Sequence, residues 1–160
     1  MSKVELSSGW VLLIPVGLIA CLLGWLSPVH EQMHAGAVYL VGGEVTGLEW
    51  AKIWWNSPRN TWGFIRFMGY GGEVLFYGAL ALMFKRAGLF FFGALLPIGV
   101  MAALSIDFSM IEGGWILLLG VMWLITVVSV GRVRLRAYAP ALAQDEPEPS
   151  PRIDHHARLR

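Results

Sequence analysis

Four long apolar stretches constrain the fold of this chain more than any other feature of its sequence. A helix needs about 20 mostly apolar residues to cross about 30 Å of hydrocarbon. Four stretches approach that length, at about residues 9–26, 62–84, 88–106 and 113–130. The first can also continue past Pro28 to Val41. The pattern predicts an all-α integral membrane protein with about four transmembrane helices.

Composition supports a membrane protein and argues against other classes. Hydrophobic residues are 56% of the chain and charged residues 14%, against roughly 45–50% and 25% in a typical soluble domain. A disordered chain needs low hydrophobicity and high net charge, and a soluble domain needs more polar surface to cover a core of this size. The net charge of +1 gives no reason to expect nucleic acid as a partner. The lipid bilayer is the partner that this composition predicts.

The distribution of basic residues predicts how the chain lies in the membrane. Four spans place both termini on one side, and that side holds most of the basic residues near the spans: Lys3, Lys85, Arg86, Arg132, Arg134 and Arg136. The other side holds Lys52 and Arg59. The positive-inside rule therefore predicts that both termini are cytoplasmic. We expect a membrane domain over residues 1–138 and a disordered cytoplasmic tail over residues 139–160, which are rich in Pro, Asp, Glu and Arg.

The motif His30-Glu31-Gln32-Met33-His34 (HExxH) is the part of the sequence most typical of a chemical function. On a helix, two residues four positions apart lie on one face, so His30 and His34 can bind one metal ion. Glu31 can accept a proton from a water molecule that zinc has made acidic. The alternative is a polar cluster at the membrane interface, with both imidazoles hydrogen-bonded to backbone or lipid headgroups.

Two signals bound the helix that carries this motif. Proline is favoured at the first position of a helix, so Ser27-Pro28 can start a new helix with Ser27 as its cap. Alternatively, Pro28 kinks one long helix. In both cases we expect a helix from His30 to Val41, ended by Gly42-Gly43. The first predicted transmembrane helix is therefore interrupted at a proline and carries the HExxH motif near its non-cytoplasmic end.

A third metal ligand must come from outside the motif. Asp107 and Glu112 both lie in the connection between the third and fourth stretches, which is expected on the same side of the membrane as the motif. Glu73 lies well inside the second stretch. It either pairs with Arg66, two turns earlier, or faces the metal cavity as a polar group. The residues alone leave these alternatives open.

Three segments together resemble the site-2 protease family of membrane-embedded zinc metallopeptidases, and most closely its small, minimal bacterial branch. The first is the HExxH motif with the apolar stretch and Gly-Gly pair that follow it, over residues 30–45. The second, Met68-Gly69-Tyr70-Gly71-Gly72-Glu73, is similar to a small-residue segment in the next span of the family. The third stands in the place of a late aspartate ligand, and is either Ser105-Ile106-Asp107 or Ile111-Glu112-Gly113-Gly114.

The resemblance implies a metalloprotease of a bacterial inner membrane that hydrolyses peptide bonds in or next to the bilayer. It implies one Zn²⁺ ion as cofactor, Glu31 as general base, and three metal ligands: His30, His34 and Asp107, with Glu112 as the alternative to Asp107. Glu73, Gly69 and Tyr70 would belong to the cavity around the metal. The glycines of this segment either leave room for that cavity or serve close helix packing. The substrate would be a membrane-spanning or membrane-adjacent protein or peptide.

A second function competes with the protease. The chain is small and has no Leu-Asp-Gly segment late in its sequence, which favours a non-catalytic scaffold or accessory subunit of a larger membrane complex. The intact HExxH motif favours the enzyme, because a scaffold has no need of Glu31.

Overall fold

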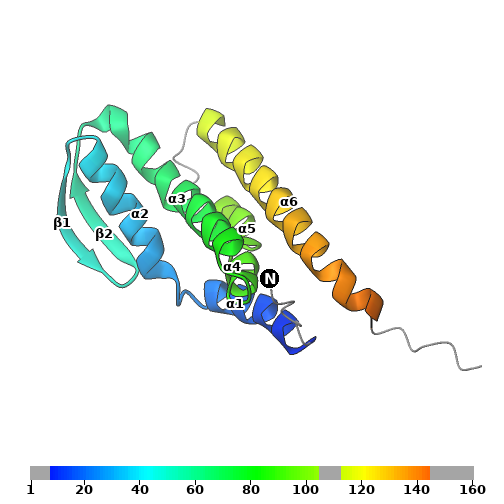
Figure 1. The fold of residues 1–160 in the computed structure, drawn as a ribbon. Coiled ribbons are helices and arrows are strands. Elements are labelled where there is room, and N and C mark those ends of the chain that lie inside the picture. The colour runs from blue at the N-terminus through cyan, green and yellow to red at the C-terminus, as the bar shows by residue number, and fades with distance from the viewer. Residues whose placement is uncertain (1–7, 105–112, 145–160) are drawn as a thin grey trace, which may run out of the picture.

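The computed structural model describes residues 8–104 and 113–144, and helices predominate in them (Figure 1). Six α-helices and a two-stranded sheet are the main described elements. In chain order the elements are η1 (Ser8–Leu12), α1 (Leu13–Leu22), α2 (Ser27–Leu40), β1 (Glu44–Glu49), β2 (Lys52–Asn56), η2 (Arg59–Thr61), α3 (Trp62–Met83), α4 (Gly88–Leu95), α5 (Ile98–Leu104) and α6 (Gly113–Gln144).

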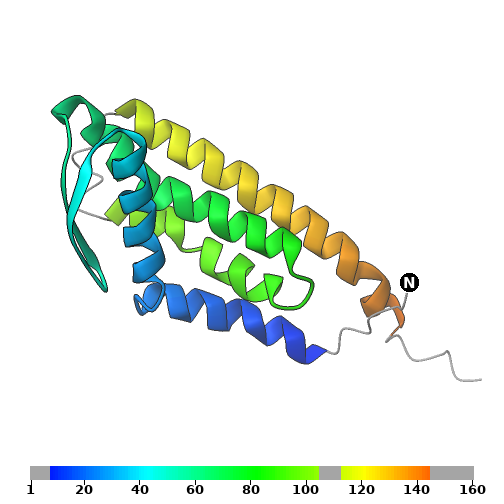
Figure 2. The same cartoon turned by 60° about the vertical axis from the view of Figure 1, so that its left-hand side comes forward.

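Helix α3 is the centre of the packing. It contacts α2, α4, α5 and α6, and Figures 1 and 2 show these helices gathered around it. Its buried residues include Val74 and Tyr77, which pack with Leu95 and Ile98 in the main apolar core. Because four helices contact α3, a polar side chain on its buried face is shielded from water and is costly to leave without a hydrogen bond.

Helices α1 and α4 lie side by side and approach closely through glycine (Figure 2). A Cβ atom on Gly17 would collide with the carbonyl group of Phe90, and one on Gly93 would collide with that of Ile14. Small residues allow two helix backbones to approach in this way, as is common between membrane helices.

The first predicted span is two helices rather than one. α1 and α2 meet at an angle of 64°, and Gly24 between them has a φ of +72°. α2 begins at Ser27 and has proline in its first turn, so Pro28 starts a new helix as one alternative predicted. Ser27 is not the cap, because that position belongs to Leu26. The predicted end at the glycine pair is confirmed, since α2 ends at Leu40 and Gly42 has a φ of +73°.

The expectation of an all-α fold is wrong between α2 and α3, where β1 and β2 form an antiparallel hairpin. The strands pair Val45 with Trp55 and Leu48 with Ile53, with an irregularity between Val45 and Gly47. Valine, isoleucine and tryptophan favour strands. The hairpin packs along α2 (Figure 1), and the indole Nε1 of Trp50 donates a hydrogen bond of 3.4 Å to the Gly24 carbonyl.

The second and third predicted stretches differ in how well they form single helices. α3 covers the second stretch to within one residue of its predicted end. The third is broken into α4 and α5 at Leu96 and Pro97, because proline lacks the amide N–H that a continuous helix requires. α6 matches the start of the fourth stretch but continues to Gln144, past the expected domain boundary at residue 138. The rest of the expected tail, residues 145–160, lies outside the described residues.

Within the described residues, one helix is long and apolar enough to cross a membrane, over Gly114–Ala137 of α6. Only 11% of its most apolar window is buried inside the protein. The segments Trp10–Leu22 and Ser27–Leu40 meet the same criterion only when taken together across their bend. The apolar segment Gly88–Leu104 is shorter than a span. The fold is therefore mostly helical with one candidate span, and four transmembrane helices remain a proposal.

Candidate metal centre

The two histidines of the motif lie one turn apart on α2 and their rings meet. The Nε2 atoms of His30 and His34 are 3.0 Å apart. Their ring centroids are 4.6 Å apart and the ring planes are nearly perpendicular, at 84°. Both side chains contact α3, where a Cβ atom on Gly69 would meet both rings. The helix therefore brings the two imidazoles to one point, as the spacing of the motif predicts.

The other ring nitrogen of His34 is held by the backbone of α3. Its Nδ1 lies 2.7 Å from the carbonyl oxygen of Ile65. A carbonyl oxygen only accepts hydrogen bonds, so Nδ1 carries the proton and donates it. In the neutral imidazole, Nε2 of His34 is then the unprotonated nitrogen and has a lone pair available for a metal.

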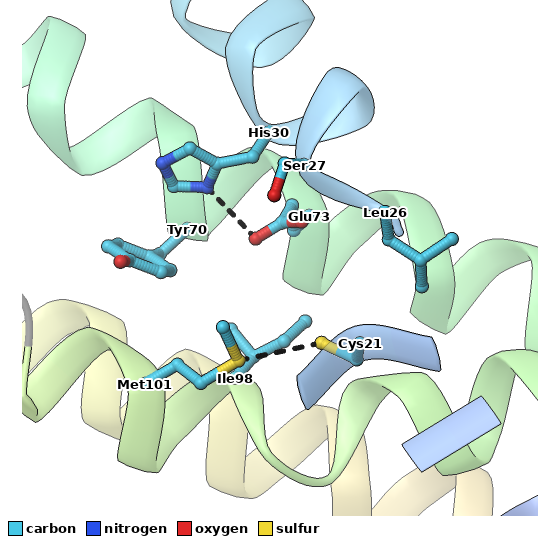
Figure 3. A pocket seen from close by; sticks show the side chains of 8 residues that line it. All are labelled: Cys21, Leu26, Ser27, His30, Tyr70, Glu73, Ile98 and Met101. Carbon is cyan, nitrogen blue, oxygen red and sulfur yellow. Dashed lines mark hydrogen bonds and ion pairs between the residues drawn. The ribbon is translucent and has the colours of Figure 1, made fainter. Parts of the chain in front are cut away.

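The other ring nitrogen of His30 is held by a carboxylate of α3. Its Nδ1 lies 3.0 Å from Oε2 of Glu73 (Figure 3). The carboxylate is almost fully buried, with 6% of its side chain exposed. A carboxylate accepts a hydrogen bond from a ring N–H, so this contact favours the tautomer of His30 that carries its proton on Nδ1. Glu73 thus pairs with His30 rather than with Arg66, whose guanidinium lies 5.8 Å from the centre of the Trp62 ring.

These two contacts decide what the facing Nε2 atoms can do. With both Nδ1 atoms donating, two neutral imidazoles would place two lone pairs 3.0 Å apart. Two acceptors at that distance repel each other unless a proton or a cation lies between them. Two nitrogen ligands about 2.0–2.1 Å from a tetrahedral zinc ion would be roughly 3.3 Å apart. The histidines therefore fit a shared metal ion after a small opening of the pair.

Aromatic rings surround the imidazole pair. The ring of Tyr70 lies 4.4 Å from that of His30, centre to centre, in an edge arrangement. The indole of Trp55 stacks on His34 at 5.9 Å. Tyr70 was expected in the cavity, whereas the sequence analysis missed Trp55. Trp55 lies two residues after Ile53, as side chains on one face of a strand do, and both are less exposed than their neighbours in β2. That spacing was the only sequence signal for Trp55.

Glu31 is buried beside the first histidine, with 9% of its surface exposed. Burial removes the carboxylate from bulk water, and its place in the motif puts it next to His30, a candidate metal ligand. The two alternatives for the third ligand, Asp107 and Glu112, lie outside the described residues. Across residues 8–104 and 113–144, no group of three His, Cys, Asp or Glu side chains has the arrangement of a metal site.

A small pocket beside His30 is lined in part by two sulfur-containing residues that were not predicted at the site. Its volume is about 90 Å³. Figure 3 shows His30, Tyr70 and Glu73 on one side of it and Cys21 and Met101 on the other. The thiol of Cys21 lies 3.7 Å from the sulfur of Met101. The pocket extends the site from α2 and α3 toward α1 and α5.

Comparisons with protein-family models, with curated proteins and with solved structures find no match to this chain. The site is therefore assigned on its own geometry.

Proposed function

We propose that this protein is a membrane-embedded zinc metallopeptidase of the site-2 protease type, which hydrolyses peptide bonds in or next to the bilayer. One observation carries the proposal: the Nε2 atoms of His30 and His34 face each other at 3.0 Å while both Nδ1 atoms contact acceptors. Metal-binding histidines are characteristically held in this way, with the second ring nitrogen bonded to a carboxylate or a carbonyl.

In this proposal each residue of the motif has one role. His30 and His34 would hold the ion through Nε2, and Asp107, or alternatively Glu112, would supply the third protein ligand. Zinc bound there would act as a Lewis acid, which would polarise the scissile carbonyl and make water acidic enough to react at neutral pH. Glu31 takes the proton of the attacking water and returns it to the leaving amine, as a general base and then a general acid.

The surface of the protein supports the membrane setting. Large apolar side chains are exposed along α6, among them Leu117, Leu124, Ile125 and Leu135. Others are exposed on α1, such as Ile19 and Leu22. A soluble monomer rarely exposes apolar surface on this scale. We propose four spans, with both termini cytoplasmic, in a bacterial inner membrane, and a membrane-spanning or membrane-adjacent peptide as substrate.

The proposal is tested by metal content and proteolysis in detergent-purified full-length protein. We expect about one zinc per chain in the wild type and in Glu31→Gln, and none in His34→Ala. Gln32→Ala is the matched control, because Gln32 lies in the same motif with an exposed side chain. Cleavage of a reconstituted membrane peptide should be lost in Glu31→Gln and retained in Gln32→Ala. Wild-type protein without zinc would overturn the proposal and favour a membrane scaffold.

A further inference from the structure

We propose that Glu73 is a positioning residue of this centre: it fixes the orientation and the tautomer of the His30 ring through Nδ1 and does not itself bind the metal. The inference rests on the proposed function, in which His30 binds the ion through Nε2. It assigns Glu73 a role that the sequence left between an ion pair with Arg66 and a cavity-facing group.

Glu73 contacts the side of the His30 ring that faces away from His34. Oε2 of Glu73 lies 3.0 Å from Nδ1 of His30, whereas the Nε2 atom of the same ring faces His34. The two nitrogens of an imidazole point in divergent directions. The carboxylate therefore lies across the ring from the point where the two Nε2 atoms meet. A carboxylate in this place can orient a metal-binding histidine but cannot share its metal.

The contact between Glu73 and His30 is buried. The side chain of Glu73 is 6% exposed and that of His30 is 16% exposed, so their hydrogen bond is largely shielded from water. A buried carboxylate without a partner is costly, above all within a membrane. Its bond to His30 offsets that cost, and the charge makes the imidazole a better metal donor. Rotation of His30 would leave the carboxylate without this bond, so the pair holds the ring in one orientation.

Helices α2 and α3 pack closely beside the contact between Glu73 and His30. A Cβ atom on Gly69 would meet both imidazoles, and one on Gly72 would meet the side chain of Met33. Both glycines precede Glu73 within about one helical turn and are buried on α3, as Glu73 is. They let α2 approach until the carboxylate reaches His30. Glu73 is thus a buried charged group on a helix whose glycines allow close contact with α2.

Metal affinity tests this role in the full-length protein. Zinc affinity is measured by competition with a chromophoric chelator, and coordination by the visible absorption of Co²⁺. We expect Glu73→Gln to weaken zinc binding about 10–100-fold, with one ion per chain and an unchanged Co²⁺ spectrum. Unchanged affinity would overturn the inference. Complete loss of binding by a folded variant would do so too, because it would make Glu73 a ligand.

Glu49→Gln is the matched control, because it makes the same chemical change at an exposed position of the hairpin. It should leave zinc affinity unchanged. Failure of the wild type to bind zinc would instead overturn the proposed function, so the two failures are distinguishable.

A second measurement needs no metal. Nitrogen NMR of labelled histidine in metal-free wild-type protein should show His30 protonated at Nδ1. In Glu73→Asp, which keeps the charge, that form should persist in part, whereas Glu73→Gln should shift the population toward protonation at Nε2. Protonation of wild-type His30 at Nε2 would contradict the inference directly, whatever the variants do.

Discussion

The indole ring of Trp55 stacks on the imidazole of His34, with ring centroids 5.9 Å apart and planes inclined by 18°. Trp55 lies on β2 and His34 on α2, so the hairpin contributes directly to the candidate metal centre. His34 is then held on two sides, by the Ile65 carbonyl of α3 and by this indole. The hairpin packs along α2 and forms one wall of the site.

Removing the indole should loosen His34 without removing a ligand. A stacked aromatic pair contributes about 0.5–1.5 kcal/mol, so we expect Trp55→Ala to lower zinc affinity roughly 3–10-fold. Trp55→Phe should retain most of the affinity. Trp54→Ala is the control, because the neighbouring indole is exposed and packs on Gly47 instead. An equal loss of affinity in Trp54→Ala would mean that the hairpin as a whole, rather than the stack, supports the site.

Gly69 leaves the space that the two imidazoles occupy on α3. A methyl group there would meet ring atoms of both His30 and His34, so we expect Gly69→Ala to abolish or strongly reduce zinc binding. Gly36→Ala is the matched control, since a Cβ atom on this α2 glycine meets nothing within 4 Å. Alanine is favoured over glycine in helices by up to about 1 kcal/mol, so the control should bind zinc normally and be as stable as the wild type. Full zinc binding by a folded Gly69→Ala variant would contradict the described contact.

Single helices could be predicted from the sequence where a local signal bounds them. Pro28 and Gly42 mark the two ends of α2, and α3 follows its apolar stretch almost residue for residue. Pro97, which separates α4 from α5, carried an equally local signal that the length of the apolar stretch obscured. The hairpin was missed because it is short and lies between two much stronger helical patterns.

The partners of the histidines could not be predicted with the same means. The spacing of HExxH was sufficient to bring His30 and His34 together. Glu73 is 43 residues from His30 along the chain, and their contact depends on how α3 is rotated about its own axis. A helix that is apolar on most sides gives little periodic signal for that rotation. The choice for Glu73 between an ion pair with Arg66 and a place facing the metal cavity therefore required the structure, as did its contact with His30.

The contact between α1 and α4 predicts that substitutions there lower the stability of the protein without touching the candidate metal centre. Gly17 faces the Phe90 carbonyl so closely that a larger side chain must push the helices apart. Such overpacking costs about 1–3 kcal/mol, so we expect Gly17→Val to lower the thermal midpoint by roughly 3–10 °C. Circular dichroism of the detergent-purified protein measures it. Gly120→Ala on α6 should melt like the wild type, because its Cβ atom meets nothing within 4 Å. A wild-type midpoint in Gly17→Val would show that α1 and α4 separate easily.

Zinc should stabilise the folded protein, because an ion that binds only the native state raises the free energy of unfolding. At about 100 times its dissociation constant, the gain is about 2.7 kcal/mol. We therefore expect a chelator to lower the thermal midpoint of the wild type by several degrees, and added Zn²⁺ to restore it. His34→Ala should respond to neither, since it lacks one of the two facing nitrogens. A wild-type midpoint that zinc leaves unchanged would contradict the shared site.

The same measurement distinguishes the two alternatives for the third ligand. The contacts of the imidazole pair join α2 to α3 and to β2, whereas a ligand from the connection between α5 and α6 would also attach that connection to the motif. We expect Asp107→Ala to abolish the zinc-dependent rise in thermal midpoint, and Glu112→Ala to retain it. The reverse result would move the ligand to Glu112. Loss in neither variant would contradict both assignments, because the ion would then be held without a ligand from this connection.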